Sequence, residues 1–235
     1  MNARSPGPRT SLRLSAWLLL AGQLLYVLVT LLHADGIAND HPAVFAEYAD
    51  SAIWTVVHLG QFACMAVFLA GLFALFFALD TQSEIAKWTA RFGVALVVAT
   101  LALYGAVLAV DGVALKQAVN AWTGASDAEK VARFASAETT RWLEWGMRSY
   151  QNFVLGLAVL LFAAGVARTG WIPRPIAYLM GVAGFAYFVQ GWTAGSVGFS
   201  QTHQTAIVVT EAVNLVWMIW LVVVAWRMGE SDFSS

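Results

Sequence analysis

Six long apolar stretches constrain the fold of this chain more than any other feature of the sequence. Each is about long enough to cross a hydrocarbon core of roughly 30 Å, which takes about 20 helical residues. They are too continuously apolar for barrel strands, which alternate over about ten residues, and lipid tolerates no other spanning structure. We therefore predict an all-α polytopic integral membrane protein. Its single domain, residues 1–235, would have transmembrane helices at about 14–33, 52–79, 91–113, 150–167, 175–198 and 204–226.

The composition supports lipid as the surrounding solvent. Hydrophobic residues make up 60% of the chain and charged residues only 11%, whereas a soluble domain carries roughly 25% charged residues. The net charge of −1 argues against a nucleic-acid partner, because phosphate binding needs a basic surface. The one cysteine, Cys64, excludes an intrachain disulfide and a multi-cysteine metal site.

The distribution of Lys and Arg predicts the orientation. If the N-terminus is inside, the inner segments hold most of the basic residues, and the first and last outer loops hold none. The positive-inside rule then places both termini in the cytoplasm of a multi-pass cell-membrane protein. Arg4, Arg9 and Arg13 precede the first apolar stretch, which is longer than a signal-peptide core of roughly 7–15 residues. We interpret this stretch as an uncleaved first helix.

The segment between the third and fourth apolar stretches also has a helical pattern. Ser126 and Glu129 have the spacing of a capping box, which marks a helix start. Phe134, Trp142 and Trp145 supply side chains that favour a membrane interface. We predict an amphipathic helix at about 126–148 that lies on the outer surface or extends the fourth transmembrane helix.

Polar side chains within the apolar stretches indicate a site. Ionisable residues are costly in a bilayer and usually face a cavity or the interior of the bundle. In this orientation every such residue falls in the outer half of the membrane, whereas the inner half is nearly all apolar. We predict an outward-facing polar cluster that consists of His58, Gln61, Asp111, Glu144, Arg148, Gln151, Glu211 and Asn214.

Helical spacing suggests some of the pairings in this cluster. Glu144 and Arg148 lie four residues apart, so they can form an ion pair. Glu211 lies about two turns deep and needs a proton or a cation, which Arg148, His58 or Lys116 could provide. We expect Lys116 to reach the interface rather than to pair with Asp111. The alternative for the whole cluster is that its members only bond neighbouring helices together.

Three functions fit these patterns. The first is binding or transport of a small ligand from the outer side, with Glu211 and His58 as groups that could link it to protons. The second is a metal or haem protein of redox or hydrolytic activity, in which His33, His58 and His203 are the candidate ligands of a divalent metal or haem.

The third function is that of a structural or accessory subunit in a membrane complex. Six helices are few for a transporter acting alone, so the transport function predicts a homodimer or a larger membrane complex. The sequence contains no phosphate-binding loop, zinc-protease motif or nucleophile elbow, so it leaves open whether the chain is an enzyme.

Overall fold

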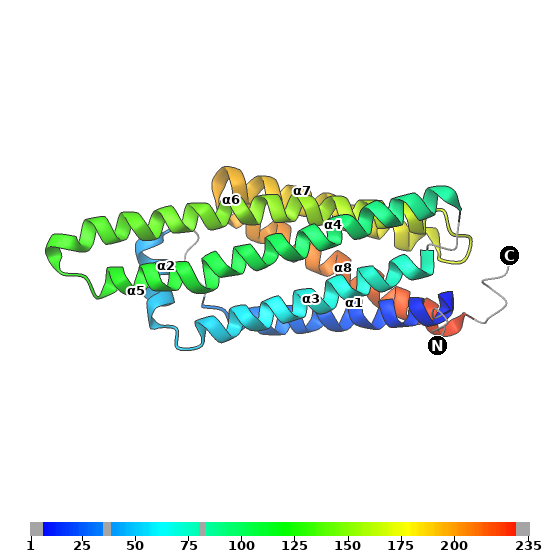
Figure 1. The fold of residues 1–235 in the computed structure, drawn as a ribbon, viewed down its shortest axis with the longest axis horizontal. Helices are drawn as coiled ribbons and strands as arrows, with labels where there is room; N and C mark the ends of the chain where they lie inside the picture. Colours follow the sequence, from blue (N-terminus) through cyan, green and yellow to red (C-terminus); the bar gives the residue numbers. More distant parts are fainter. Residues whose placement is uncertain (1–6, 35–38, 80–82, 229–235) are drawn as a thin grey trace, which may run out of the picture.

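The computed structural model describes residues 7–34, 39–79 and 83–228, and in these ranges the chain is helical without strands. Arg4, which contributes to the predicted charge balance, lies outside the described residues. Figure 1 shows long helices that run along one axis, with one short helix, α2, lying across the bundle near one end. The helices are α1 (Pro8–Thr30), α2 (His41–Asp50), α3 (Trp54–Leu79), α4 (Glu84–Ala109), α5 (Lys116–Thr123), α6 (Asp127–Val166), α7 (Arg174–Val197) and α8 (Gln201–Arg227).

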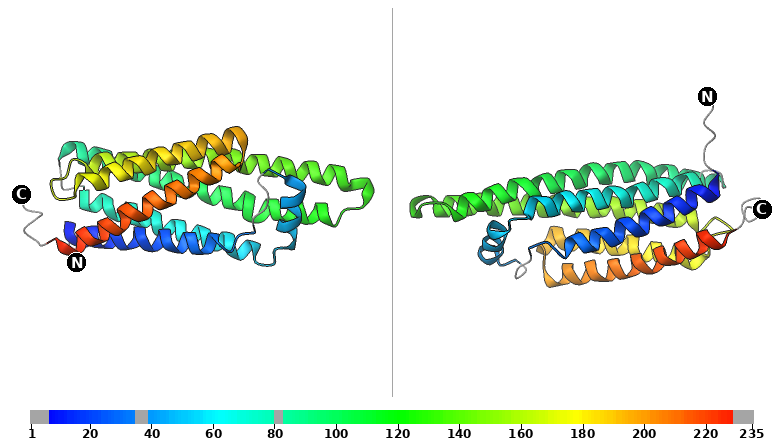
Figure 2. Two further views of the ribbon diagram at one scale, coloured as in Figure 1. Left: turned by 180° about the vertical axis from the view of Figure 1, so that it is seen from behind. Right: turned by 90° about the horizontal axis from the view of Figure 1, so that it is seen from below.

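The long helices form a closed ring. Around the ring α1 packs on α3, α3 on α4, α4 on α6, α6 on α7, α7 on α8, and α8 on α1. Helix α8 runs obliquely, so its N-terminal part lies beside α7 and its C-terminal end lies beside the start of α1 (Figure 2). The start of α1 and the end of α8 are tied together, because Arg13 Nε donates a hydrogen bond to the Ala225 carbonyl at 3.0 Å.

Five helical segments of the described chain are long and apolar enough to cross a membrane. They are α1, α3, the run Glu84–Thr123, α6 and α8, and they indicate a membrane location. Helix α7 coincides with the predicted fifth span, but its composition does not place it among these five segments. The all-helical class and a polytopic membrane fold are therefore supported, and the sixth span and the orientation remain predictions.

The predicted surface helix is not a separate element. Residues 127–166 form one continuous helix of 40 residues, α6, which joins the predicted surface helix to the fourth span. No proline interrupts the sequence between Ser126 and Ile172, so nothing in it forces a break. At 1.5 Å per residue α6 is about 60 Å long, roughly twice the hydrocarbon thickness. The helix begins after Ser126 as predicted, although the Ser126 side chain makes no capping hydrogen bond.

Two further elements differ from the sequence prediction. The third predicted span, 91–113, is part of a longer run in which α4 continues through a π-helical turn, Val110–Leu115, into α5. Helix α2 was not predicted. Asp40 caps its N-terminus by accepting a hydrogen bond from Ala43 N, and Pro42 lies in its first turn, where a proline is tolerated.

Lys116 holds the other end of α2. Its ammonium group donates to the carbonyls of Tyr48, Ala49 and Ser51 at 2.6, 2.7 and 3.0 Å. These carbonyls lie at the C-terminal end of α2, where a cation is favourable. Lys116 therefore binds the C-terminal end of a helix. The sequence had suggested instead that this side chain reaches the membrane interface.

A glycine makes the tight connection between α7 and α8 possible. Gly198 has φ of 67°, in the left-handed region that side chains other than glycine rarely adopt. A Cβ at this position would lie 2.4 Å from the ring of Trp145 on α6. The connection thus packs directly on α6, and Ser200 caps the start of α8 by accepting from His203 N.

The end of the bundle that holds the start of α1 and the end of α8 is filled by apolar side chains. They come from all six long helices and leave a continuous core at that end. Representative members with almost no exposed surface are Leu12, Leu72, Leu79, Ala90, Phe162, Met180 and Leu221.

Candidate functional site

The opposite end of the ring encloses a cavity of about 660 Å³. This volume is in the range of about 300–1,000 Å³ that is typical of small-molecule sites. Helices α1, α2, α3, α6, α7 and α8 and the π-helical turn after α4 contribute to its wall, and the side chains are both polar and apolar. Examples are Gln23 of α1, Gln61 of α3, Asp111 of the π-helical turn, Arg148 of α6, Tyr187 of α7 and Glu211 of α8.

The cavity opens sideways between the end of α1 and the start of α8. Leu31 and Val208 both line it, yet 76% and 67% of their surface is exposed. The two helices are in contact, and Arg13 of α1 is tied to Ala225 of α8. The start of α1 and the end of α8 lie at the far end of the bundle (Figure 2). In a bilayer this apolar rim would face lipid rather than water.

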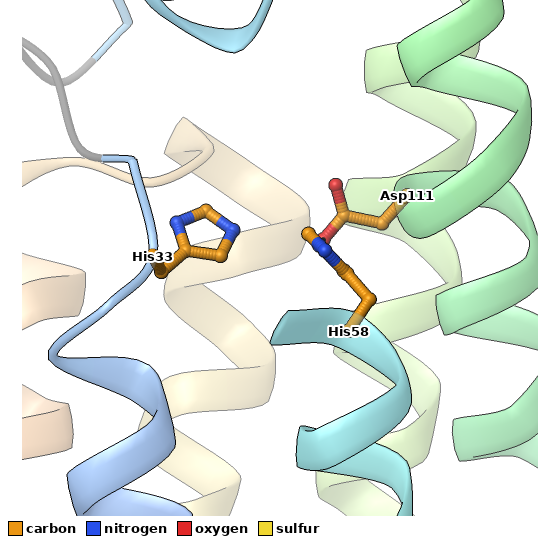
Figure 3. A group of neighbouring side chains, drawn as sticks. All are labelled: His33, His58 and Asp111. Carbon is orange, nitrogen blue, oxygen red and sulfur yellow. The ribbon is translucent and has the colours of Figure 1, made fainter. Parts of the chain in front are cut away.

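Two histidines and an aspartate form a compact group at the edge of the cavity. His33 follows α1, His58 lies in the second turn of α3, and Asp111 lies in the π-helical turn after α4 (Figure 3). One ligand atom from each lies within 4.8 Å of the other two. His58 Nε2 and Asp111 Oδ2 are 3.1 Å apart, and both side chains are buried.

Hydrogen bonds fix the orientation of His58. Its Nδ1 lies 2.7 Å from the Trp54 carbonyl, which can only accept, so Nδ1 carries the proton. The second ring nitrogen, Nε2, is thereby directed at Asp111. Metal-binding histidines also commonly have one ring nitrogen held by a backbone carbonyl in this way.

The π-helical turn places Asp111 beside His58. Trp54 Nε1 donates to the Asp111 carbonyl at 3.1 Å. A Cβ on Gly112 would lie 2.8 Å from His58 Cβ, so only a glycine permits this approach of α3 to the turn. Single π-turns within α-helices occur frequently at functional sites.

His33 lies among aromatic rings. Its ring centroid is 4.9 Å from that of Trp54, 5.0 Å from that of His58 and 5.9 Å from that of Tyr48. Burial lowers the pKa of the His33 imidazole, against the opposing effect of the Asp111 carboxylate. The lowered pKa favours the neutral form of the His33 ring.

A buried ion pair lies next to this group. Arg141 Nη1 donates to Glu144 Oε2 at 2.6 Å, and Arg141 Nη2 donates to the Tyr48 hydroxyl at 3.0 Å. Burial raises the pKa of Tyr48 above its usual range. The sequence predicted a pair between Glu144 and Arg148, but Glu144 pairs with Arg141, three residues before it.

Arg148 lines the cavity without a carboxylate at ion-pair distance in the part of the chain that the structure describes. Its guanidinium lies 5.2 Å from the centre of the Tyr104 ring, which gives a cation–π contact. Gln151, one turn further along α6, also lines the cavity. Its side-chain nitrogen and oxygen are buried and have no hydrogen-bond partner among the residues that the structure describes.

Glu211 lies in the wall of the same cavity. Gln23 of α1 donates a hydrogen bond to its carboxylate, and Asn214 donates to the Gln23 oxygen at 3.4 Å and to the Tyr187 hydroxyl at 2.9 Å. None of the three cations that the sequence offered as partners of Glu211 pairs with it in the described residues. An amide network across α1, α7 and α8 takes their place.

The structure thus brings most of the predicted polar cluster to one cavity. Gln61, Asp111, Arg148, Gln151 and Glu211 line it directly. His58, Glu144 and Asn214 contact lining residues and are almost fully buried.

The third predicted metal ligand, His203, also lines the cavity, but it is not part of the His33–His58–Asp111 group. It is hydrogen-bonded to Thr193 at 2.9 Å and stacks on Phe199.

Sequence reasoning missed Gln23, Tyr48 and Arg141. Gln23 is the only amide in the first apolar stretch, so a signal was present. Arg141 fell in the predicted surface helix and Tyr48 in a predicted loop, where a polar side chain carries little information.

A comparison with protein-family models matches residues 14–225 to a family described as "Domain of unknown function (DUF4386)". The chain belongs to the DUF4386 family. The match spans α1 to α8 and so includes every wall of the cavity. No curated protein and no solved structure matches this DUF4386 chain.

Proposed function

We propose that this chain binds a small amphiphilic molecule with an anionic head group in its cavity. One observation carries the proposal: Arg148 and Gln151 line the cavity without a carboxylate or amide partner among the described residues. A buried amide that makes no hydrogen bond costs about 1–3 kcal/mol. A ligand that reaches both groups would offset this cost and supply the missing anion.

The side chains of Arg148 and Gln151 on α6 indicate the kind of head group that the cavity would bind. A guanidinium presents several donors in one plane and suits carboxylate and phosphate oxygens. The Gln151 amide lies three residues later on the same face and can donate one further hydrogen bond. Fatty-acid carboxylates and phospholipid phosphates share this chemistry.

The rest of the cavity suits an apolar chain. Met65, Phe68 and Leu155 contribute apolar surface to its wall, and Leu31 and Val208 form an exposed apolar rim. A ligand that enters from the bilayer would pass this rim with its chain in lipid. The predicted approach from the outer leaflet follows from the predicted orientation.

Binding is better supported than transport. The apolar core closes the bundle between the cavity and the end that holds the start of α1. Transport would require that core to open. Proton coupling would fall to Glu211, which lies in the same wall as Gln23 and has no cation partner within the described part of the chain.

The test is native mass spectrometry of the full chain released in mild detergent, followed by identification of any bound mass. We expect a stoichiometric lipid or fatty acid on the wild type. In Arg148→Gln, loss of charged hydrogen bonds worth about 1.5–3 kcal/mol would weaken binding roughly tenfold or more. The mass distinguishes a phospholipid from a free fatty acid.

The matched control is Arg133→Gln. Arg133 is also on α6, but 52% of its side chain is exposed and its nearest carboxylate, that of Glu129, is 3.9 Å away. This variant should retain the bound mass. A bare wild-type chain that also fails to take up added oleate or phosphatidylglycerol would overturn the proposal, as would equal retention in both variants.

A further inference from the structure

We infer that His33, His58 and Asp111 bind one divalent transition-metal ion, Zn²⁺ by preference, at the edge of the cavity. The three side chains come from three separate parts of the chain: the segment after α1, the start of α3 and the turn after α4 (Figure 3). Their convergence depends on the tertiary fold and on no local spacing. The inference rests on the proposed function only in that the cavity provides the open side of the metal.

The distances suit a single ion. Zinc lies about 2.0–2.2 Å from nitrogen and oxygen ligands, so two ligands of a tetrahedral site are about 3.3 Å apart. His58 Nε2 and Asp111 Oδ2 are already 3.1 Å apart, and the ligand atoms of all three residues lie within 4.8 Å of one another. His33 lies outside the helices and is only partly buried, so a small side-chain movement completes the site.

The Trp54 carbonyl fixes the direction of the His58 ring. Because Nδ1 lies 2.7 Å from that carbonyl, Nε2 faces the Asp111 carboxylate at 3.1 Å. His33 adds a third ligand atom beside this pair, so an ion between them would have three protein ligands.

One buried atom remains unexplained without an ion. Asp111 Oδ1 has no hydrogen-bond partner in residues 7–34, 39–79 and 83–228, although the residue is only 4% exposed. A buried carboxylate oxygen without a partner is costly, and buried charges are usually paired or bound to metals. A metal on this carboxylate would neutralise its charge.

The ligand set selects the class of metal. Two imidazoles and one carboxylate suit Zn²⁺ or Fe²⁺, whereas Mg²⁺ and Ca²⁺ prefer oxygen ligands alone. Three protein ligands leave a fourth tetrahedral position, as in catalytic zinc sites. His33 and Asp111 both line the cavity, so this position can receive a water molecule or the oxygen of a bound head group.

The test measures metal on the full chain, carrying a non-histidine affinity tag and purified without chelators. We expect about one zinc per chain by elemental analysis, and saturable binding of Co²⁺ with visible absorption bands. His33→Ala, His58→Ala and Asp111→Asn should each weaken the affinity for Zn²⁺ at least about 100-fold, since even supporting residues of metal sites contribute 10–100-fold.

The matched control is His203→Ala, which removes a histidine of the same cavity and should leave metal binding unchanged. Asp111→Asn is nearly isosteric and keeps the test valid if His58→Ala does not fold. A folded wild type without saturable binding of Zn²⁺, Co²⁺ or Fe²⁺ would overturn the inference. So would unchanged affinity in all three variants, or a haem absorption band that depends on His58.

The two proposals can fail separately. The metal is measured without any added amphiphile, and the Arg148→Gln variant leaves all three metal ligands in place. If the His33, His58 and Asp111 variants lose zinc but keep the bound lipid, zinc depends on those three residues. If Arg148→Gln loses the lipid but keeps zinc, the lipid depends on Arg148.

Discussion

The polar side chains at the cavity end differ in whether they have partners. Arg141 is paired with Glu144 and Tyr48, and Glu211 is bonded to Gln23. Removing one partner of a buried ion pair such as Arg141–Glu144 typically costs about 3–5 kcal/mol. We therefore assign the residues that already have partners to the framework of the site. The Gln151 amide and Asp111 Oδ1 lack hydrogen-bond partners among the described residues, and Arg148 contacts Tyr104 but no carboxylate at ion-pair distance there, so we assign these groups to ligands.

Gly112→Ala tests the close approach that positions His58. The new Cβ would lie 2.8 Å from His58 Cβ, which is closer than real Cβ contacts allow, so His58 must move. We expect the affinity for Zn²⁺ to fall about 10–100-fold although all three ligands remain. Titration of the purified variant with Zn²⁺ measures this.

The control for that variant is Gly105→Ala on the same helix run, where the added Cβ would meet only Phe62 at an ordinary 3.4 Å. It should bind Zn²⁺ like the wild type. Equal affinity in both alanine variants would contradict the view that the packing of α3 on the π-helical turn positions the site.

Among the long helices of the described chain, α7 alone lies outside the five candidate membrane spans. It closes the ring between α6 and α8, yet it is not among the five segments that are apolar enough to span by composition alone. Helices buried among others need less apolar surface, because only the lipid-facing side must be apolar.

Cysteine labelling tests whether α7 crosses the membrane. In a Cys64→Ala background, single cysteines replace the exposed residues Arg174 and Gln201, which flank α7. We expect a membrane-impermeant maleimide to label Gln201→Cys in intact cells and Arg174→Cys only after permeabilisation. Labelling of both from the same side would show that α7 does not cross.

The long helices were predictable because apolar side chains must face lipid or core along the whole span. The ends were less predictable. Helix α6 continues far past its apolar part, and the sequence there has the same helical pattern whether it lies on a surface or extends a span. Helix α2 is short and depends on Lys116 and Asp40 at its two ends, so a local pattern could not reveal it.

For the candidate site, the sequence indicated which residues take part better than it indicated which of them contact one another. A polar residue in an apolar stretch stands out, and this identified His58, Asp111 and Glu211, whereas Arg148 lies just before the fourth predicted span. Which of them meet depends on how helices rotate and cross. Glu144 therefore bonds Arg141 rather than Arg148, and His58 meets Asp111 and His33 rather than His203.

At the scale of the whole molecule, a ring of six long helices has an apolar core at one end and a polar cavity at the other. The core closes the cavity on the side of the start of α1 and the end of α8. The cavity opens sideways where the end of α1 and the start of α8 move apart. The tie between Arg13 and Ala225 holds these two helices together far from the opening. This layout suits a ligand that arrives from the bilayer and has its head group held between helices.

The most direct test of the account is a crystal structure of the full chain grown from a lipidic mesophase. We predict elongated density in the cavity, with its polar end within hydrogen-bond distance of Arg148 and Gln151 and its apolar end at the rim of Leu31 and Val208. A cavity closed by the protein's own side chains, with Arg148 and Gln151 bonded to other residues of the chain, would contradict the account.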